Sequence, residues 1–147
     1  MLRALKKGAR MIEVLRDFPA NVVAFRGTGR ITRQDYETVV IPAVTAAFQR
    51  NKAIRLYYEF APDFEGLDPG AMWEDFKVGV EHFTHWERIA IVTDMDWISN
   101  ALKVFAFLMP GEIRHFPLSD ADQARAWIVS PAALLDHPSS AETADSP

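Results

Sequence analysis

Short β-type runs alternate with helical segments along most of this chain, and this alternation limits the possible folds more than any other feature. Two β runs come first, at 11–17 and 21–27, and turn residues join them. Three more follow at 53–60, 88–93 and 112–117, each separated from the next by a segment with helical spacing. We therefore expect an α/β fold. Its small mixed sheet should have about five strands, an N-terminal antiparallel hairpin followed by β-α-β units, and about four helices.

The helical segments carry recognisable start and stop signals. Thr32 can cap the first helix, with Asp35 in the reciprocal position, and Pro42 predicts a kink inside it. Apolar residues at helical spacing predict three later helices, at about 69–85, 97–109 and 118–128.

The chain has 147 residues, which suits one domain with a single core. We place that domain at 11–130. Residues 1–10 form a basic arm, because they hold four cationic side chains and no acid. Residues 131–147 are dominated by Pro, Ser, Ala and acids, a composition that predicts a disordered tail.

Composition excludes several classes of function. A net charge of −4 argues against a nucleic-acid partner. The chain contains no cysteine, so disulfides, thiolate nucleophiles and Cys-ligated metal sites are ruled out, and a cytoplasmic location fits. No apolar run approaches the roughly 18 residues of a transmembrane segment. No motif calls for a cofactor.

Two aspartates, Asp94 and Asp96, follow the apolar run "RIAIVT". They would lie at the carboxyl end of a parallel strand, where α/β sheets often bind ligands. Asp is also a favoured helix cap, and its charge suits the start of the helix that begins near Trp97. We favour the cap interpretation.

An enzymatic alternative uses further acids. The loop "EFAPDFEGLDPG" contributes Asp63 and its acidic neighbours, which could approach Asp94 and Asp96 if their strands are adjacent. Such oxygen ligands would suit a divalent metal and a hydrolase. However, the spacing does not match a calcium loop, so a solvated acidic rim is the simpler interpretation, and we assign no metal ligands and no catalytic residues.

Apolar side chains exceed what one side of a small sheet requires. The segment 97–109 is apolar around most of its circumference, and Phe107 shares its remaining side with Asn100 and Lys103. Such a helix meets either an apolar ligand or another subunit, or else Phe107 is simply an isolated exposed residue. The candidate ligand-binding residues are Trp73, Phe76, Asp94, Asp96, Trp97, Phe105 and Phe107.

The stretches "MWEDFKVGVEHFTHWERIAIVTDMDWIS" and "EIRHFPLSDADQARAWI" resemble the SpoIIAA-like proteins, whose fold is related to STAS and SEC14-type domains. The resemblance covers about residues 11–130. It implies a mixed sheet with helices packed against it, and a binding or regulatory module more than an enzyme. It also suggests a small hydrophobic or lipid-like ligand. The phosphorylatable serine of STAS regulators has no counterpart, since "EFAPDFEGLDPG" contains neither serine nor threonine.

The sequence therefore predicts a cytoplasmic, STAS/SpoIIAA-like binding or regulatory module. Its partner would be a small hydrophobic ligand or another protein. The alternatives left open are the metal-dependent hydrolase and a pure interaction protein that forms a homodimer.

Overall fold

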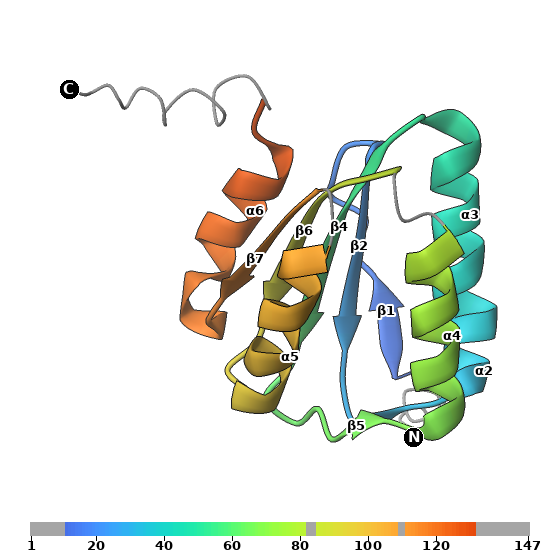
Figure 1. Ribbon diagram of the computed structural model, residues 1–147, viewed down its shortest axis with the longest axis vertical. Coiled ribbons are helices and arrows are strands. Elements are labelled where there is room, and N and C mark those ends of the chain that lie inside the picture. Colours follow the sequence, from blue (N-terminus) through green and yellow to red (C-terminus); the bar gives the residue numbers. More distant parts are fainter. Residues whose placement is uncertain (1–10, 82–84, 109–110, 132–147) are drawn as a thin grey trace.

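The structure, a computed structural model, describes residues 11–81, 85–108 and 111–131. It contains a five-stranded mixed sheet with the strand order β1-β2-β4-β6-β7 (Figure 1). β1 is antiparallel to β2 and every other neighbouring pair is parallel, which confirms the predicted hairpin and β-α-β units. The strands are β1 (Ile12–Val14), β2 (Val22–Gly27), β4 (Ile54–Phe60), β6 (Trp86–Val92) and β7 (Glu112–Phe116).

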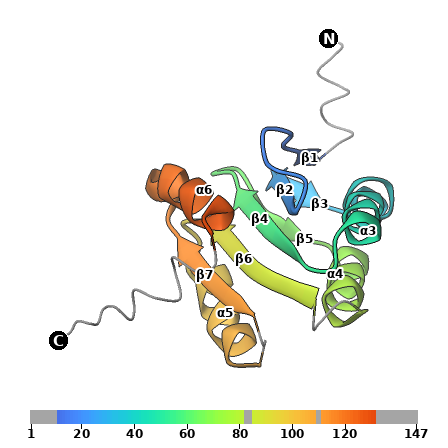
Figure 2. The ribbon, with the colours of Figure 1, turned by 90° about the horizontal axis from the view of Figure 1, so that it is seen from above.

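Helices cover both faces of this sheet. Figure 2 shows α3, α4 and α5 on one face and α6 on the other. The helical elements are α2 (Arg33–Asp35), the π-helical turn η1 (Tyr36–Val40), α3 (Ile41–Arg50), α4 (Pro69–Glu81), α5 (Asp96–Leu108), the 3₁₀ turn η3 (Leu118–Asp120) and α6 (Ala121–Val129). The predicted mixed α/β fold is therefore confirmed.

Strand alternation divides the core between the two faces. In β4, Leu56 and Tyr58 pack towards α3 and its neighbours, whereas Tyr57 packs in a second cluster together with Trp127 and Ile128 of α6. Apolar residues on both sides of β6 explain the nearly continuous run "RIAIVT", because a central strand covered on both faces has no solvated side.

The first helical segment has the predicted cap and a π-helical turn. Thr32 and Asp35 exchange the two hydrogen bonds of a capping box, at 2.8 Å and 3.2 Å. Pro42 lies in the first turn of α3, directly after η1. Since proline has no N–H to donate to the preceding turn, a wider π-helical turn is compatible with the missing hydrogen bond. The kink itself remains a prediction.

A second, two-stranded sheet was not predicted. β3 (Arg30–Ile31) pairs in parallel with β5 (Gly66–Leu67) just beyond the carboxyl ends of β2 and β4. Hydrogen bonds from Glu65 N to Gly29 O (2.7 Å) and from Asp68 N to Ile31 O (2.9 Å) extend this pairing. The β3–β5 pairing therefore holds the acidic loop before α4 against the segment that follows β2.

Candidate functional site

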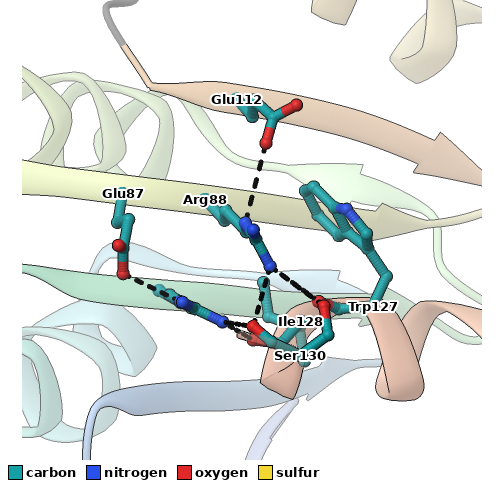
Figure 3. Close-up of polar contacts among 7 residues, drawn as sticks. Glu87, Arg88, Glu112, Trp127, Ile128 and Ser130 are labelled. Atoms are coloured by element: carbon teal, nitrogen blue, oxygen red, sulfur yellow. Dashed lines mark hydrogen bonds and ion pairs between the residues drawn. The ribbon is translucent and has the colours of Figure 1, made fainter. Parts of the chain in front are cut away.

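Two buried arginines hold the end of α6 against the sheet (Figure 3). Arg55 and Arg88 are register partners on β4 and β6, next to a shift in pairing at Ile54/Arg55. Arg55 Nη1 donates to Ile128 O (2.9 Å) and to Ser130 O (2.7 Å). Arg88 Nη1 donates to the carbonyl oxygens of Trp127 (3.1 Å) and Ser130 (3.0 Å).

Carboxylates and a helix dipole balance these two like charges. Glu87 accepts from Arg55 Nε at 2.8 Å, and Glu112 lies 3.6 Å from Arg88 Nε. The carboxyl end of a helix also carries partial negative charge, which favours cations. Because main-chain carbonyls of α6 and Ser130 accept these bonds, we interpret the arginine pair as an anchor for the helix.

A second polar group lies on the other face, among η1, β4 and α4. Tyr36 Oη donates to Asp75 Oδ1 at 2.8 Å, and the Tyr58 hydroxyl lies 3.1 Å from it. Since Tyr36 has only one hydroxyl proton, Tyr58 must donate to Tyr36. The three side chains therefore form a directed chain of hydrogen bonds that ends at a carboxylate.

Burial shifts the pKa of each member of this chain. It raises the pKa of both phenols, and the negative charge of Asp75 adds to the effect. Asp75 as a residue is exposed, but its carboxyl group packs against the tyrosines, and this desolvation raises its pKa above 3.8. The donated hydrogen bond from Tyr36 partly offsets the increase in the pKa of Asp75.

A ladder of aromatic rings leads from this group to the carboxyl edge of the sheet. Ring centroids are 4.4 Å apart between Tyr58 and Phe60, 4.6 Å between Phe60 and Phe64, and 6.3 Å between Phe64 and Trp97. The inner rings are buried, whereas Trp97 is 55% exposed. The ladder thus presents an indole to solvent at the start of α5.

The first turns of α4 contribute two more exposed apolar side chains, Met72 (57%) and Trp73 (52%). Trp73 is one of the ligand-binding candidates of the sequence, and its exposure leaves it accessible to a partner. Ala71 and Glu74 are buried, and Glu74 forms ion pairs with Arg33 and Lys77. Figure 1 shows α4 and α5 beginning at the same end of the sheet. We call Met72, Trp73, Trp97 and loop 61–68 the carboxyl rim.

Asp94 and Asp96 are both exposed, and Asp94 makes a hydrogen bond that the sequence did not predict. Asp94 Oδ1 accepts from Leu118 N at 2.8 Å and so ties η3 to the end of β6. Asp96 is the first residue of α5, where its charge suits the helix dipole. Thr93 makes two further contacts at this turn. Its Oγ1 accepts from Met95 N at 3.1 Å, and its carbonyl oxygen lies 2.8 Å from His115 Nε2.

The remaining candidates do not converge on a catalytic centre. Phe76, Phe105 and Phe107 lie on α4 and α5, but their side chains fall outside the described part of the structure, so their roles remain predictions. Within the described residues, no group of three or more His, Asp or Glu side chains is placed to hold a metal ion. Asp63, Asp94 and Asp96 are therefore not gathered into such a group in the described part of the chain.

Sequence reasoning missed Tyr36, Tyr58, Phe64 and Asp75. Phe64 gave one usable signal, an aromatic residue inside a loop otherwise rich in turn residues and acids. The tyrosines gave none, because aromatic residues are common in helices and strands that face a core.

Comparisons with known proteins identify the family and the fold. The SpoIIAA-like family model matches residues 22–129. The chain belongs to the SpoIIAA-like family. A solved structure of an uncharacterized DUF3478-family protein with a SpoIIAA-like fold, from Shewanella loihica PV-4, is 26% identical and has a TM-score of 0.64. The match covers 80% of this chain and 91% of the Shewanella chain. A comparison with curated proteins finds no match.

Membership of the SpoIIAA-like family confirms the resemblance seen in the sequence. In general terms, the family and its fold support a binding or regulatory module. Among the described residues, no helix is long and apolar enough to cross a membrane.

Proposed function

We propose that this SpoIIAA-like protein is a non-enzymatic binding module and that the carboxyl rim is its recognition surface. The observation that carries the proposal is Trp97, an indole that is 55% exposed yet stacked on the buried ring of Phe64. A large aromatic side chain has few rotatable bonds and therefore loses little conformational entropy on binding. Such residues are the usual anchors of interfaces.

The chemistry of the rim suggests an apolar occupant with a polar or cationic end. Met72 and Trp73 add apolar surface at the same edge of the sheet, and Asp96 adds a carboxylate beside Trp97. Either a hydrophobic side chain of a protein partner or a small lipid-like ligand would fit this description. Phe76, Phe105 and Phe107 remain part of the proposal as sequence-based candidates. A cytoplasmic setting, favoured by the cysteine-free sequence, also belongs to it.

The test compares two exposed apolar residues on opposite faces of the sheet. Trp97→Ser removes the rim indole, and Val129→Ser removes a 44% exposed side chain on α6. Binding of the neutral apolar dye Nile red is measured by fluorescence titration. We expect Trp97→Ser to weaken binding at least about tenfold, because an aromatic anchor is worth about 2 kcal/mol or more. Val129→Ser should leave it unchanged.

Equal dye affinities for the native protein and both variants would refute the proposal. Native mass spectrometry of the purified protein would detect a retained ligand directly. Sedimentation over a concentration series tests the homodimer alternative, because self-association that is lost in Trp97→Ser would identify a second copy as the occupant of the rim.

A further inference from the structure

The basic segment 1–10 joins the described chain at the carboxyl rim. Ile12 pairs with Gly27, the last residue of β2, so Met11 lies at the carboxyl edge of the sheet. Met11 packs against Gly29 so closely that a Cβ there would be 2.8 Å from the methionine sulfur. Gly29 O in turn accepts from Glu65 N at 2.7 Å. The carboxyl end of segment 1–10 is therefore attached beside the loop that carries Phe64.

The charges of the segment and the rim are opposite. Segment 1–10 has the cations Arg3, Lys6, Lys7 and Arg10 and no acid. Asp63 and Glu65 on the rim and Asp96 next to it are exposed, and their carboxylates form no hydrogen bond or ion pair with the described residues.

The cations near the rim leave this imbalance in place. Arg33 faces Glu37 and Glu74, and Lys77 also faces Glu74, so these two side chains are engaged elsewhere. Arg30 is exposed on β3 and offsets only part of the negative charge.

The segment is long enough to reach the exposed indole. The segment continues into β1, which lies three strands from β6, and three strand spacings amount to about 14 Å. Trp97 follows β6 in the chain. Ten extended residues span up to about 33 Å. Leu2 and Leu5 alternate with the cations and offer apolar side chains to Trp97.

We propose that residues 1–10 dock on the carboxyl rim of their own subunit. The cations would face Asp63, Glu65 and Asp96, while the leucines and the aliphatic stems of Lys and Arg would cover Trp97. This inference rests on the proposed function, since it makes the segment a competitor for the same surface. Exposed ion pairs are weak and are screened by salt, so a binding partner could displace the segment.

Because the chain has no cysteine, a single engineered pair can report the docking in the full-length protein. Ala4→Cys with Pro62→Cys places one thiol in the segment and one in the exposed loop. The matched control carries the same pair with Arg3, Lys6, Lys7 and Arg10 replaced by Gln, which keeps the tether length and removes the charge. A neutral small disulfide, hydroxyethyl disulfide, is added as the two-electron oxidant and is reduced to two molecules of mercaptoethanol. We expect the intramolecular disulfide to form at least about tenfold faster with the native charges, and the difference to disappear at about 1 M salt.

A charge exchange provides the second arm of the test. The triple variant Asp63→Lys, Glu65→Lys and Asp96→Lys should form the disulfide more slowly. Adding Arg3→Glu, Lys6→Glu, Lys7→Glu and Arg10→Glu to this variant should restore the rate. Equal rates for native and neutralised segments would overturn the docking. Disulfides that form only between two molecules would also overturn it, because the occupant would then be the segment of a second copy.

The outcome also separates this inference from the proposed function. Dye binding that depends on Trp97 but not on the segment charges would keep the proposed function and refute the docking. A charge-dependent disulfide together with dye binding that ignores Trp97 would keep the docking and refute the proposed recognition surface.

Discussion

The two faces of the sheet bury polar side chains in different ways. On the α6 face, Arg55 and Arg88 donate to main-chain carbonyls at the end of the helix, and both arginines are buried. On the opposite face, Tyr58 and Tyr36 pass a chain of hydrogen bonds to Asp75, which is exposed as a residue. The aromatic ladder on that face likewise ends at the exposed ring of Trp97.

This difference separates stability from recognition. Removal of a buried cation that donates to helix carbonyls should lower the free energy of unfolding, because each carbonyl then loses one of its hydrogen bonds. A surface indole contributes little to folding and is available for binding. Substitutions on the α6 face should therefore lower stability, whereas substitutions at the carboxyl rim should change binding.

The largest effect on folding is expected for Arg88→Met, since this side chain is 2% exposed. The change removes the bond from Arg88 to Ser130 Oγ and one donor each from Trp127 O and Ser130 O. Ser130 Oγ still donates to Trp127 O, and Arg55 Nη1 still donates to Ser130 O. We expect the free energy of unfolding to fall by about 2 to 4 kcal/mol in urea titrations. Arg114→Met is the matched control, because its exposed guanidinium stacks on the same Trp127 ring at 5.1 Å, and it should cost under about 1 kcal/mol.

Unchanged stability of Arg88→Met would mean that apolar packing of Trp127 and Ile128 suffices to hold α6. The contrast between the two faces would then disappear. Faster amide exchange confined to α6, with the rest of the sheet unaffected, would support the anchor directly.

A smaller loss of stability is expected for Tyr36→Phe, which removes the middle hydroxyl of the chain. Tyr58 then loses its acceptor and Asp75 its donor. We expect a loss of about 1 to 2 kcal/mol in the free energy of unfolding, the cost of leaving buried polar groups unpaired. Phe48→Leu on the same face, which alters packing without removing a hydroxyl, controls for the loss of shape. A Tyr36→Phe variant as stable as the native protein would show that the chain of bonds contributes nothing.

The pH dependence of stability tests the carboxylate of that chain. Burial raises the pKa of Asp75 in the folded state above its ordinary value of 3.8, so the folded protein holds this proton more firmly than the unfolded chain does. The resulting contribution to stability is fully present below the unfolded pKa and is lost as pH rises through the folded pKa. Asp75→Asn removes this dependence.

Urea titrations of native protein and Asp75→Asn at a series of pH values measure the effect. The stability of the variant relative to the native protein should increase between about pH 3 and pH 7. A relative stability that falls over this range would show that hydrogen bonding to Tyr36, rather than desolvation, dominates the pKa of Asp75.

The sequence predicted the framework of the fold because the signals for it are local. Periodicity indicated the five strands of the main sheet, and the capping box at Thr32 follows from residues three apart. The β3–β5 pair escaped prediction because two-residue strands have no periodicity, and their glycines are equally typical of turns.

The buried polar groups could not be predicted, since their partners are distant in the chain. Arg55 contacts Ser130, 75 residues away, and Tyr36 contacts Asp75, 39 residues away. An arginine in a strand normally indicates a solvated side, and only the packing of α6 reverses that expectation here. Trp97 is a candidate that the sequence alone suggests, but its contact with Phe64 depends on the adjacency of β4 and β6.

The smallest expected effects distinguish the two aspartates next to the rim. Asp94→Ala removes the acceptor of Leu118 N and should cost about 1 kcal/mol of folding free energy, as for a lost helix cap. Asp96→Asn removes only a charge from the first turn of α5, and we expect a change within about 0.5 kcal/mol. Paired urea titrations of the two variants measure this difference. If Asp96→Asn lowers the free energy of unfolding more than Asp94→Ala does, Asp96 is the helix cap. If Asp96→Asn leaves folding unchanged but alters the affinity for Nile red, its carboxylate takes part in recognition at the carboxyl rim.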